Sequence, residues 1–215
     1  MPRVSKTQTE ANHQAIEHAA SRLFRQRGMH AVTVAEVMSE AGLTHGGFYA
    51  HYRSKDALAA AACSRAFAAS ADRWQQVIDH AAAPSMALDA IAQDYLRTSN
   101  RDPATATCPT ATLVTDVARA DQSHPIQAAY LEGVTRQIDT LAGLGTSGNP
   151  AQDRADACVR LATMMGALLL VRAAHGHKLA DEIATAAKAR LTRGESKHSA
   201  LRQPTRRTRA KRGAR

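Results

Sequence analysis

The 215-residue chain has few aromatic residues, few cysteines and no long apolar run. Phe, Trp and Tyr make up 4% of it, and no stretch alternates apolar and polar residues over strand length, which argues against a β-sheet protein. Cys63, Cys108 and Cys158 form no CxxC pair, which argues against a disulfide framework and favours a reducing compartment. The longest apolar stretch, 161–171, is shorter than the ~20 residues that span a bilayer. The first residues have no apolar signal-peptide core. We therefore expect a soluble, cytoplasmic protein.

Positive charge is concentrated at the two ends of the chain. Residues 193–215 hold nine Lys and Arg against one Glu, a net charge of +8. Residues 1–55 carry a net charge of +3, and residues 56–192 carry a net charge of −2. Basic ends around a mildly acidic middle indicate that the ends meet a polyanion and that the middle has a different role.

Alanine-rich stretches with helical periodicity fill most of the sequence, so we predict an all-α fold of about nine helices. Thr9 is the expected N-cap of the first helix, and Gly28 its stop. Thr33 opens the second helix with Glu36 three residues on, which is a capping-box pattern, and Gly42 ends it.

The remaining helices follow from the same signals. Thr44 is expected to cap a very short third helix, and Ser54 a long fourth helix that ends near His80. Five more helices are predicted: one around Leu88, Ile91 and Tyr95; one from Pro109 to about Asp121; one with the stripe Leu131, Val134, Ile138 and Leu141; and two over about 151–175 and 178–192.

Residues 33–52 read TVAEVMSEAGLTHGGFYAHY, which predicts two short helices joined by a tight turn that contains Gly42. This arrangement is typical of the helix-turn-helix, whose second helix enters the major groove of DNA. Thr44, His45 and Gly46 lie at the start of that second helix, where short side chains let the backbone approach DNA. Helix N-termini also offer free N–H groups to phosphates.

In this segment the sequence resembles the TetR family of bacterial transcription regulators. The likeness is specific over about residues 9–60 and only architectural beyond them. The matching residues form a Thr-led helix followed by G-x-x-Y-x-H-[FY]-x-x-K-x-x-L, and they are Thr33, Val37, Ala41, Gly42, Gly46, Phe48, Tyr49, His51, Tyr52, Ser54, Lys55 and Leu58.

The resemblance implies DNA-binding roles for seven residues in and around this motif, while three of its apolar residues are interpreted as core residues. Residues expected to bond phosphates are Thr33, Tyr49, His51 and Lys55; residues expected to face base edges are Thr44, His45 and Gly46; residues expected in the core are Phe48, Tyr52 and Leu58. The family usually has a hydroxyl-bearing residue at Gly47 and often Lys at His45. Base readout is therefore expected to depend more on DNA shape and water than on long side chains.

The resemblance also implies three parts of the chain. Residues 1–53 would form the helix-turn-helix domain, and residues 54–192 a helical domain that binds a small-molecule effector and dimerises. The composition of residues 193–215 predicts a disordered basic tail. Residues 161–171 are apolar on almost every face, so we expect a homodimer joined through residues 151–192, with burial inside one chain as the alternative.

Candidate effector-binding residues are Trp74, Tyr95, Cys108 and Tyr130, and core packing explains them equally well. We find no nucleophile–base set, metal-ligand set or phosphate loop, and we expect no enzymatic activity, cofactor or metal. The leading hypothesis is a transcriptional repressor released from palindromic double-stranded DNA by a small molecule. The alternative is a low-specificity DNA-organising protein that relies on its basic tail.

Overall fold

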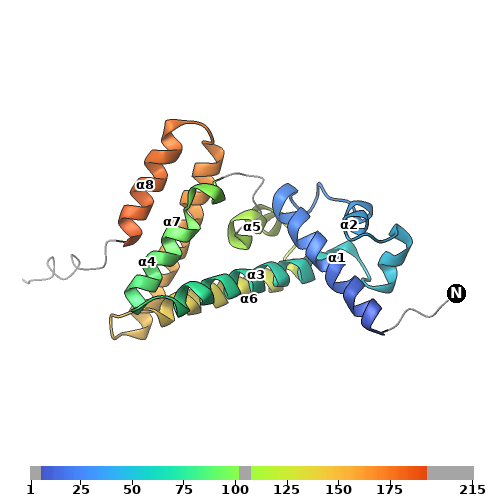
Figure 1. The fold of residues 1–215 in the computed structure, drawn as a ribbon, viewed down its shortest axis with the longest axis horizontal. Coiled ribbons are helices and arrows are strands. Elements are labelled where there is room, and N and C mark those ends of the chain that lie inside the picture. The colour runs from blue at the N-terminus through green and yellow to red at the C-terminus, as the bar shows by residue number, and fades with distance from the viewer. Residues whose placement is uncertain (1–5, 102–107, 193–215) are drawn as a thin grey trace, which may run out of the picture.

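A computed structural model of the chain describes residues 6–101 and 108–192, and every regular element in these two stretches is helical (Figure 1). In chain order the elements are α1 (Lys6–Arg27), α2 (Val34–Glu40), the 3₁₀ helix η1 (His45–Ala50), α3 (Lys55–Asp79), α4 (Pro84–Tyr95), the 3₁₀ helix η2 (Thr98–Asn100), α5 (Pro109–Arg119), α6 (Pro125–Gly143), α7 (Pro150–Ala173) and α8 (Lys178–Thr192). The predicted all-α fold is confirmed. The predicted disordered tail, 193–215, lies outside the described residues.

Local signals set most of the helix boundaries. The Ser54 hydroxyl accepts a hydrogen bond from the Ala57 N–H at 3.1 Å and so caps α3, as predicted. Gly28 ends α1 with a φ of 81°, a conformation that favours glycine. The predicted cap at Thr9 is wrong, because α1 begins at Lys6 and Thr9 lies inside it. Residues 6–8 are Lys, Thr and Gln, none of which prevents a helix from starting a turn earlier.

The long helices α3 and α6 lie side by side and form the spine of the molecule (Figure 1). Gly133 of α6 allows a close approach, since a Cβ there would meet the Phe67 ring of α3 at 2.2 Å. The side of α6 that is buried is marked by Tyr130, Gly133, Gln137 and Leu141. The predicted stripe is therefore wrong at its first member, because Leu131 is 60% exposed. The buried face of α6 includes Tyr130, the residue before Leu131, instead.

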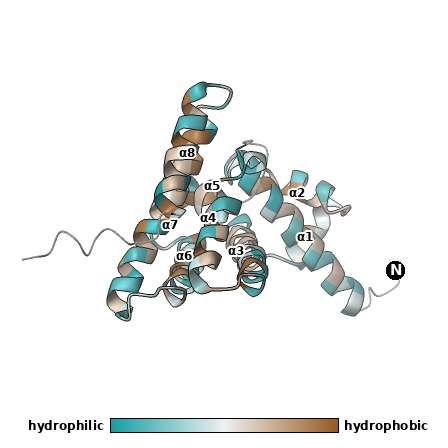
Figure 2. Ribbon diagram, turned by 60° about the vertical axis from the view of Figure 1, so that its left-hand side comes forward, coloured by the Kyte–Doolittle hydropathy of each residue, from teal (hydrophilic) through white to brown (hydrophobic). Residues whose placement is uncertain are grey.

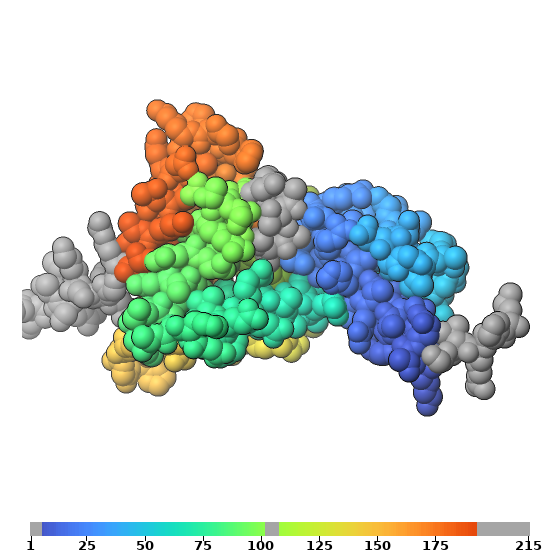
Figure 3. Space-filling view, in the orientation of Figure 1, coloured from blue at the N-terminus to red at the C-terminus, as the bar shows by residue number. Residues whose placement is uncertain are grey.

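Two apolar cores meet along this spine. One joins α1, α2 and η1, which we call the head, to α3, α5 and α6. The other joins α3 and α6 to α4, α7 and α8, which lie at the opposite end of the molecule (Figure 3). Within the described residues, no helix is long and apolar enough to cross a bilayer.

Candidate nucleic-acid interface

Helix α2 opens with the capping box predicted at Thr33 and Glu36. The Thr33 hydroxyl accepts from the Glu36 N–H at 3.2 Å, and the Glu36 carboxylate accepts from the Thr33 N–H at 2.7 Å and from its hydroxyl at 2.8 Å. These bonds, with an ion pair to Arg27 at 2.8 Å, lower the pKa of Glu36 from its ordinary 4.5 to about 2. The box is confirmed, and it fixes where α2 begins.

The box also uses both hydrogen-bond donors of Thr33, its N–H and its hydroxyl. A DNA phosphate at this position would have to replace the Glu36 carboxylate as the acceptor. The role that the structure gives Thr33 is to cap α2, and its contact with phosphate stays a prediction.

The turn after α2 is closed by glycine. The Gly42 N–H donates to the Ser39 carbonyl at 3.0 Å, and the Leu43 N–H donates to the Met38 carbonyl at 2.8 Å, which together form a Schellman motif. Gly42 has a φ of 71°, a backbone conformation that is energetically unfavourable for residues other than glycine. This turn sets the direction in which the chain leaves α2 and enters η1.

The second element of the helix-turn-helix is the short 3₁₀ helix η1. Its N-cap residue Thr44 has the extended backbone that a cap requires, but its side chain makes no capping hydrogen bond. Thr44 is therefore at the N-cap position as predicted, but its side chain does not make the capping hydrogen bond. The 3₁₀ geometry closes this turn through the backbone, with the Gly47 N–H donating to the Thr44 carbonyl at 3.0 Å. The Thr44 residue is exposed, and its hydroxyl makes no capping bond.

Two neighbouring aromatic residues orient η1. Phe48 is 1% exposed and packs in the core of the head, where burial contributes roughly 2 kcal/mol. Tyr49 is 72% exposed, and its ring meets the Phe48 ring edge-on at 5.2 Å between centroids. Phe48 thus anchors η1 in the core, as predicted, while Tyr49 is exposed and its contact with phosphate stays a prediction.

The predicted DNA-facing residues all lie within residues 33–55, which run from the start of α2 through η1 to the start of α3, at the end of the molecule farthest from α8 (Figure 3). Those that are exposed are Thr33, Thr44, His45, Gly46 and Tyr49; those that are half-buried are His51, which follows η1, and Lys55, which begins α3. All seven therefore have some accessible surface.

A polar network that the sequence analysis missed holds this stretch against α1. The Tyr52 hydroxyl donates to the Glu17 carboxylate at 2.8 Å and lies 3.1 Å from the His13 ring nitrogen Nε2. The His13 and Tyr52 rings stack at 4.8 Å, and Arg65 of α3 lies 3.7 Å from Glu17. Burial and the bond to Glu17 raise the pKa of Tyr52 well above its ordinary value. Tyr52 is in the core as predicted, and it also ties α1 to the start of α3.

Positive charge near these residues comes from Lys55 of the motif and also from a position that the motif leaves unspecified. Arg53 is exposed directly before Ser54, and the family pattern does not include it. The signal that could have found it is its charge next to a helix N-cap. By contrast, the α1 residues Arg22 and Arg27 are paired with Glu40 and Glu36 of α2 and brace the head internally.

Helix α5 links the head to the rest of the molecule. The Asp116 carboxylate accepts a hydrogen bond from the Met29 N–H at 2.8 Å, just after the glycine that ends α1. A Cβ at Gly28 would lie 3.5 Å from the same carboxylate. A second link joins His124, before α6, to Asp56 in the first turn of α3 at 3.3 Å. A shift of α5 would therefore act directly on the end of α1, and a shift at the start of α6 would act on the start of α3.

The four candidate effector-binding residues are all buried. The Tyr95 hydroxyl donates to the Cys108 sulfur at 2.7 Å, and Trp74 packs in the same core. Tyr130 packs in the other core, and its hydroxyl donates to the Thr110 carbonyl at 2.7 Å. A cavity of about 610 Å³ opens between α3 and α4, and none of the four lines it. In this structure they are packing residues, and their contact with an effector stays a prediction.

Residues 16–62 match the sequence profile of the bacterial regulatory proteins of the tetR family. A 42-residue stretch is 48% identical to the uncharacterised HTH-type transcriptional regulator YerO of Bacillus subtilis and covers 20% of this chain but only 14% of YerO. The whole fold is similar to SCO4454, a TetR-family regulator from Streptomyces coelicolor, with a TM-score of 0.70, 20% identity, and coverage of 86% of this chain and 95% of that one.

Reduced NemR of Escherichia coli is similar to the same extent, with a TM-score of 0.70, 21% identity, and coverage of 84% and 95%. At such low sequence identities, these structures show only that the fold is similar. The profile match covers the capped helices, the glycine turn and η1 described above. Residues 16–62 therefore belong to the tetR family of bacterial regulatory proteins, and the described chain as a whole has the fold of the TetR-family regulator SCO4454.

Proposed function

We propose that this protein is a homodimeric transcriptional repressor that binds a palindromic operator and leaves it when a small molecule binds. The observation that carries the proposal is the exposed edge of η1. Thr44, His45 and Tyr49 face the solvent there, on a short helix held by the buried Phe48. A short helix presented in this way fits the major groove of DNA.

Two kinds of contact are expected along this edge. Tyr49, His51 and Lys55 would bond phosphates, which positions the protein without reading sequence. Thr44 and His45 would reach base edges, since they stand at the N-terminal end of η1 and the Thr44 hydroxyl is not used as a cap. Gly46 supports a close approach, because nothing lies within 4 Å of where its Cβ would be.

The DNA-binding roles can be tested by fluorescence anisotropy with the DNA upstream of the protein's own coding region and with a scrambled duplex. Tyr49→Phe should weaken binding to both duplexes by roughly fivefold, the effect of one lost hydrogen bond. His45→Ala should instead change the ratio of the two affinities. Equal affinity of the unaltered protein for both duplexes would reject sequence-specific regulation and would favour the low-specificity alternative.

Dimerisation is supported by large apolar side chains that are exposed on α7 and α8, two helices that carry hydrophobic segments (brown in Figure 2). Val159 is 65% exposed and Leu170 57% on α7, and Leu179 of α8 is 45% exposed. Between them, a Cβ at Gly166 would meet nothing within 4 Å, so a second helix could approach closely there. A two-fold axis through this face would place two heads on one duplex, as a palindromic operator requires.

The dimer can be tested with two leucines of similar exposure. Leu170→Arg should reduce the mass measured by ultracentrifugation from about 46 kDa to the 23.0 kDa of one chain, and it should abolish operator binding. Leu131→Arg, at a site on α6 that is 60% exposed, should change neither. Leu168, in the same apolar stretch of α7, is not a suitable site for this test, because it is 1% exposed and packs within its own chain. A Leu170→Arg protein that stays dimeric would reject this interface.

A further inference from the structure

Helix α1 places a histidine beside the DNA-facing stretch of the head. The ring of His13, a residue outside the family pattern, lies 6.0 Å from the ring of His51, measured between centroids. His51 is half-buried directly after η1, and it is one of the residues expected to bond a DNA phosphate. The two rings belong to separate segments of the chain, so the packing of α1 against this stretch brings them together.

One nitrogen of the His13 ring is held by two oxygen atoms. Its Nε2 lies 3.1 Å from the Tyr52 hydroxyl oxygen and 3.3 Å from the Glu17 carboxylate. The Tyr52 hydroxyl donates to Glu17 at 2.8 Å, and burial together with this bond raises the pKa of Tyr52, so the hydroxyl keeps its proton. Because that proton goes to Glu17, the Tyr52 oxygen accepts from His13, which places a hydrogen on Nε2.

The second ring nitrogen, Nδ1, is where His13 can take up a further proton. No described residue forms a hydrogen bond with Nδ1, and the side chain is 35% exposed to solvent. A proton added there keeps both contacts of Nε2 and the stacking of His13 on Tyr52, at 4.8 Å between centroids. Histidine is the side chain that titrates between about pH 5 and pH 8. The charge at this position can therefore change in that range while the network stays intact.

The titratable and charged side chains that face the His13 ring come from α1, from the stretch after η1 and from α3; they are Glu10, Glu17, His51, Tyr52 and Arg65. Glu17 contacts the ring nitrogen through one carboxylate oxygen, and Arg65 lies 3.7 Å from the other oxygen. A protonated His13 therefore has an anionic partner at contact distance although Arg65 binds the same carboxylate.

We propose that His13 carries a proton-linked positive charge beside the DNA phosphate that His51 binds, so that binding of duplex DNA takes up a proton at His13. This inference rests on the proposed function, because it requires DNA to lie along the η1 side of the head. A polyanion favours the protonated form of a neighbouring ring, and by linkage the protonated ring favours binding of the polyanion. The affinity for DNA should therefore rise as the pH falls.

The expected size of the effect follows from Coulomb's law. A positive and a negative charge about 8 Å apart at a protein surface change a binding equilibrium roughly threefold. Two heads on one duplex should together give roughly a tenfold effect. Salt screens charges at such separations, so the measurement requires low and constant ionic strength.

Fluorescence anisotropy near pH 6 and near pH 8 tests the proposal, with the upstream duplex and the scrambled duplex. Near pH 6 the unaltered protein should bind both duplexes roughly tenfold more tightly than His13→Gln, and near pH 8 the two proteins should bind equally. Glutamine can still donate to the Tyr52 oxygen but takes up no proton. His13→Lys, which is charged at both pH values, should keep its high affinity near pH 8.

His18→Gln is the matched control. His18 is exposed on the same helix, five residues after His13 and therefore on a different face. This variant should follow the pH profile of the unaltered protein. His45 and His51 also titrate, but every variant contains them, so ratios of affinity between variants cancel their contribution. An equal loss of affinity in His13→Gln near pH 6 and near pH 8 would indicate a purely structural role and overturn the proposal, as would an equal change in His18→Gln.

The two duplexes separate this inference from the proposed function. A pH profile that depends on His13 on both duplexes, without preference for the upstream DNA, would support the proton linkage and reject sequence-specific regulation. Preference for the upstream DNA with the same pH profile in His13→Gln and the unaltered protein would overturn the linkage and leave the regulator intact. Preference for the upstream DNA together with a pH profile that depends on His13 is the expected result.

Discussion

The contact between Gly133 and Phe67 gives the most specific stability prediction, because there is no space for the methyl group that an alanine at position 133 would add. A Cβ at Gly133 would lie 2.2, 2.3 and 2.6 Å from three ring carbons of Phe67. The ring is 3% exposed and meets the Tyr130 ring edge-on at 5.6 Å. It therefore has little freedom to move aside, and Gly133→Ala must push α3 and α6 apart or distort the rotamer of Phe67.

The expected magnitude is the difference between two opposing effects. Overpacking a core costs about 1–3 kcal/mol, and this overlap lies at the upper end. Replacing a helical glycine by alanine regains up to about 1 kcal/mol. The net loss should be about 2 kcal/mol, or roughly 4–8 °C in the melting temperature of a chain of this size.

Thermal unfolding followed by circular dichroism at a fixed protein concentration measures this difference, because the melting temperature of a dimer depends on concentration. Gly143→Ala is the control within the same helix, since nothing lies within 4 Å of a Cβ there, and it should be neutral or slightly stabilising. A Gly133→Ala protein as stable as the control would show that the spine is looser than the structure indicates.

Two further predictions concern the head. The capping box of Glu36, whose pKa is lowered from 4.5 to about 2, stabilises the fold fully above pH 4.5 and loses this effect as the pH falls towards 2. The difference in melting temperature between the unaltered protein and Glu36→Gln should therefore shrink over that interval; a constant difference would contradict the cap. Asp116→Asn should lower the free energy of unfolding by about 1 kcal/mol in urea, because the Met29 N–H loses a charged acceptor. An unchanged free energy of unfolding would contradict a stabilising role for this contact.

The sequence by itself determined the elements whose signals are local. The box at Thr33 and Glu36, the left-handed Gly42 and the cap at Ser54 all act within four residues along the chain, so their geometry follows from residue type and spacing. Local signals also failed in two places. Thr9 looked like a cap although an earlier start was equally possible, and Thr44 left its capping role to the backbone of a 3₁₀ turn.

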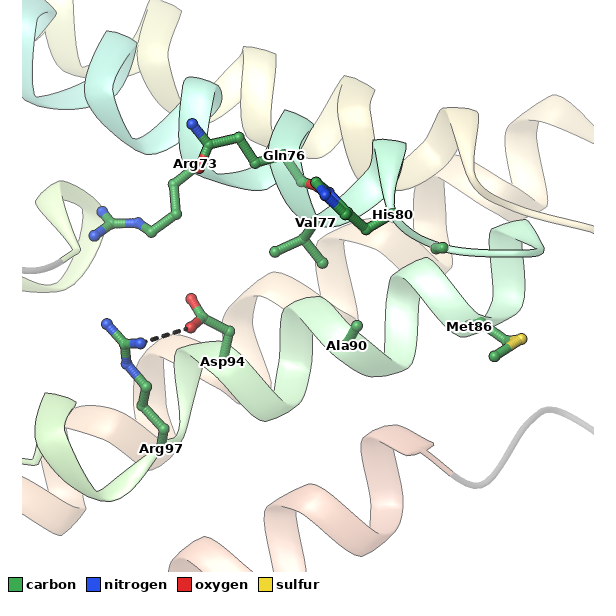
Figure 4. Close-up of a pocket in the computed structure, with 9 residues that line it drawn as sticks. Arg73, Gln76, Val77, His80, Met86, Ala90, Asp94 and Arg97 are labelled. Carbon is green, nitrogen blue, oxygen red and sulfur yellow. Dashed lines mark hydrogen bonds and ion pairs between the residues drawn. The ribbon is translucent and has the colours of Figure 1, made fainter.

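Only the tertiary structure decided which faces of the helices meet. The periodicity of α6 favours a stripe that begins at Leu131, but the close approach at Gly133 turns Tyr130 toward α3 and leaves Leu131 in the solvent. Residue type alone likewise could not distinguish a residue that lines a pocket from one that packs in the core. The aromatic candidates Trp74 and Tyr95 are in fact buried in the core. The cavity instead lies between Val77 of α3 and Ala90 of α4 (Figure 4), which come together because α4 folds back along α3. Such pairs depend on packing between distant parts of the chain, and no spacing within one helix encodes them.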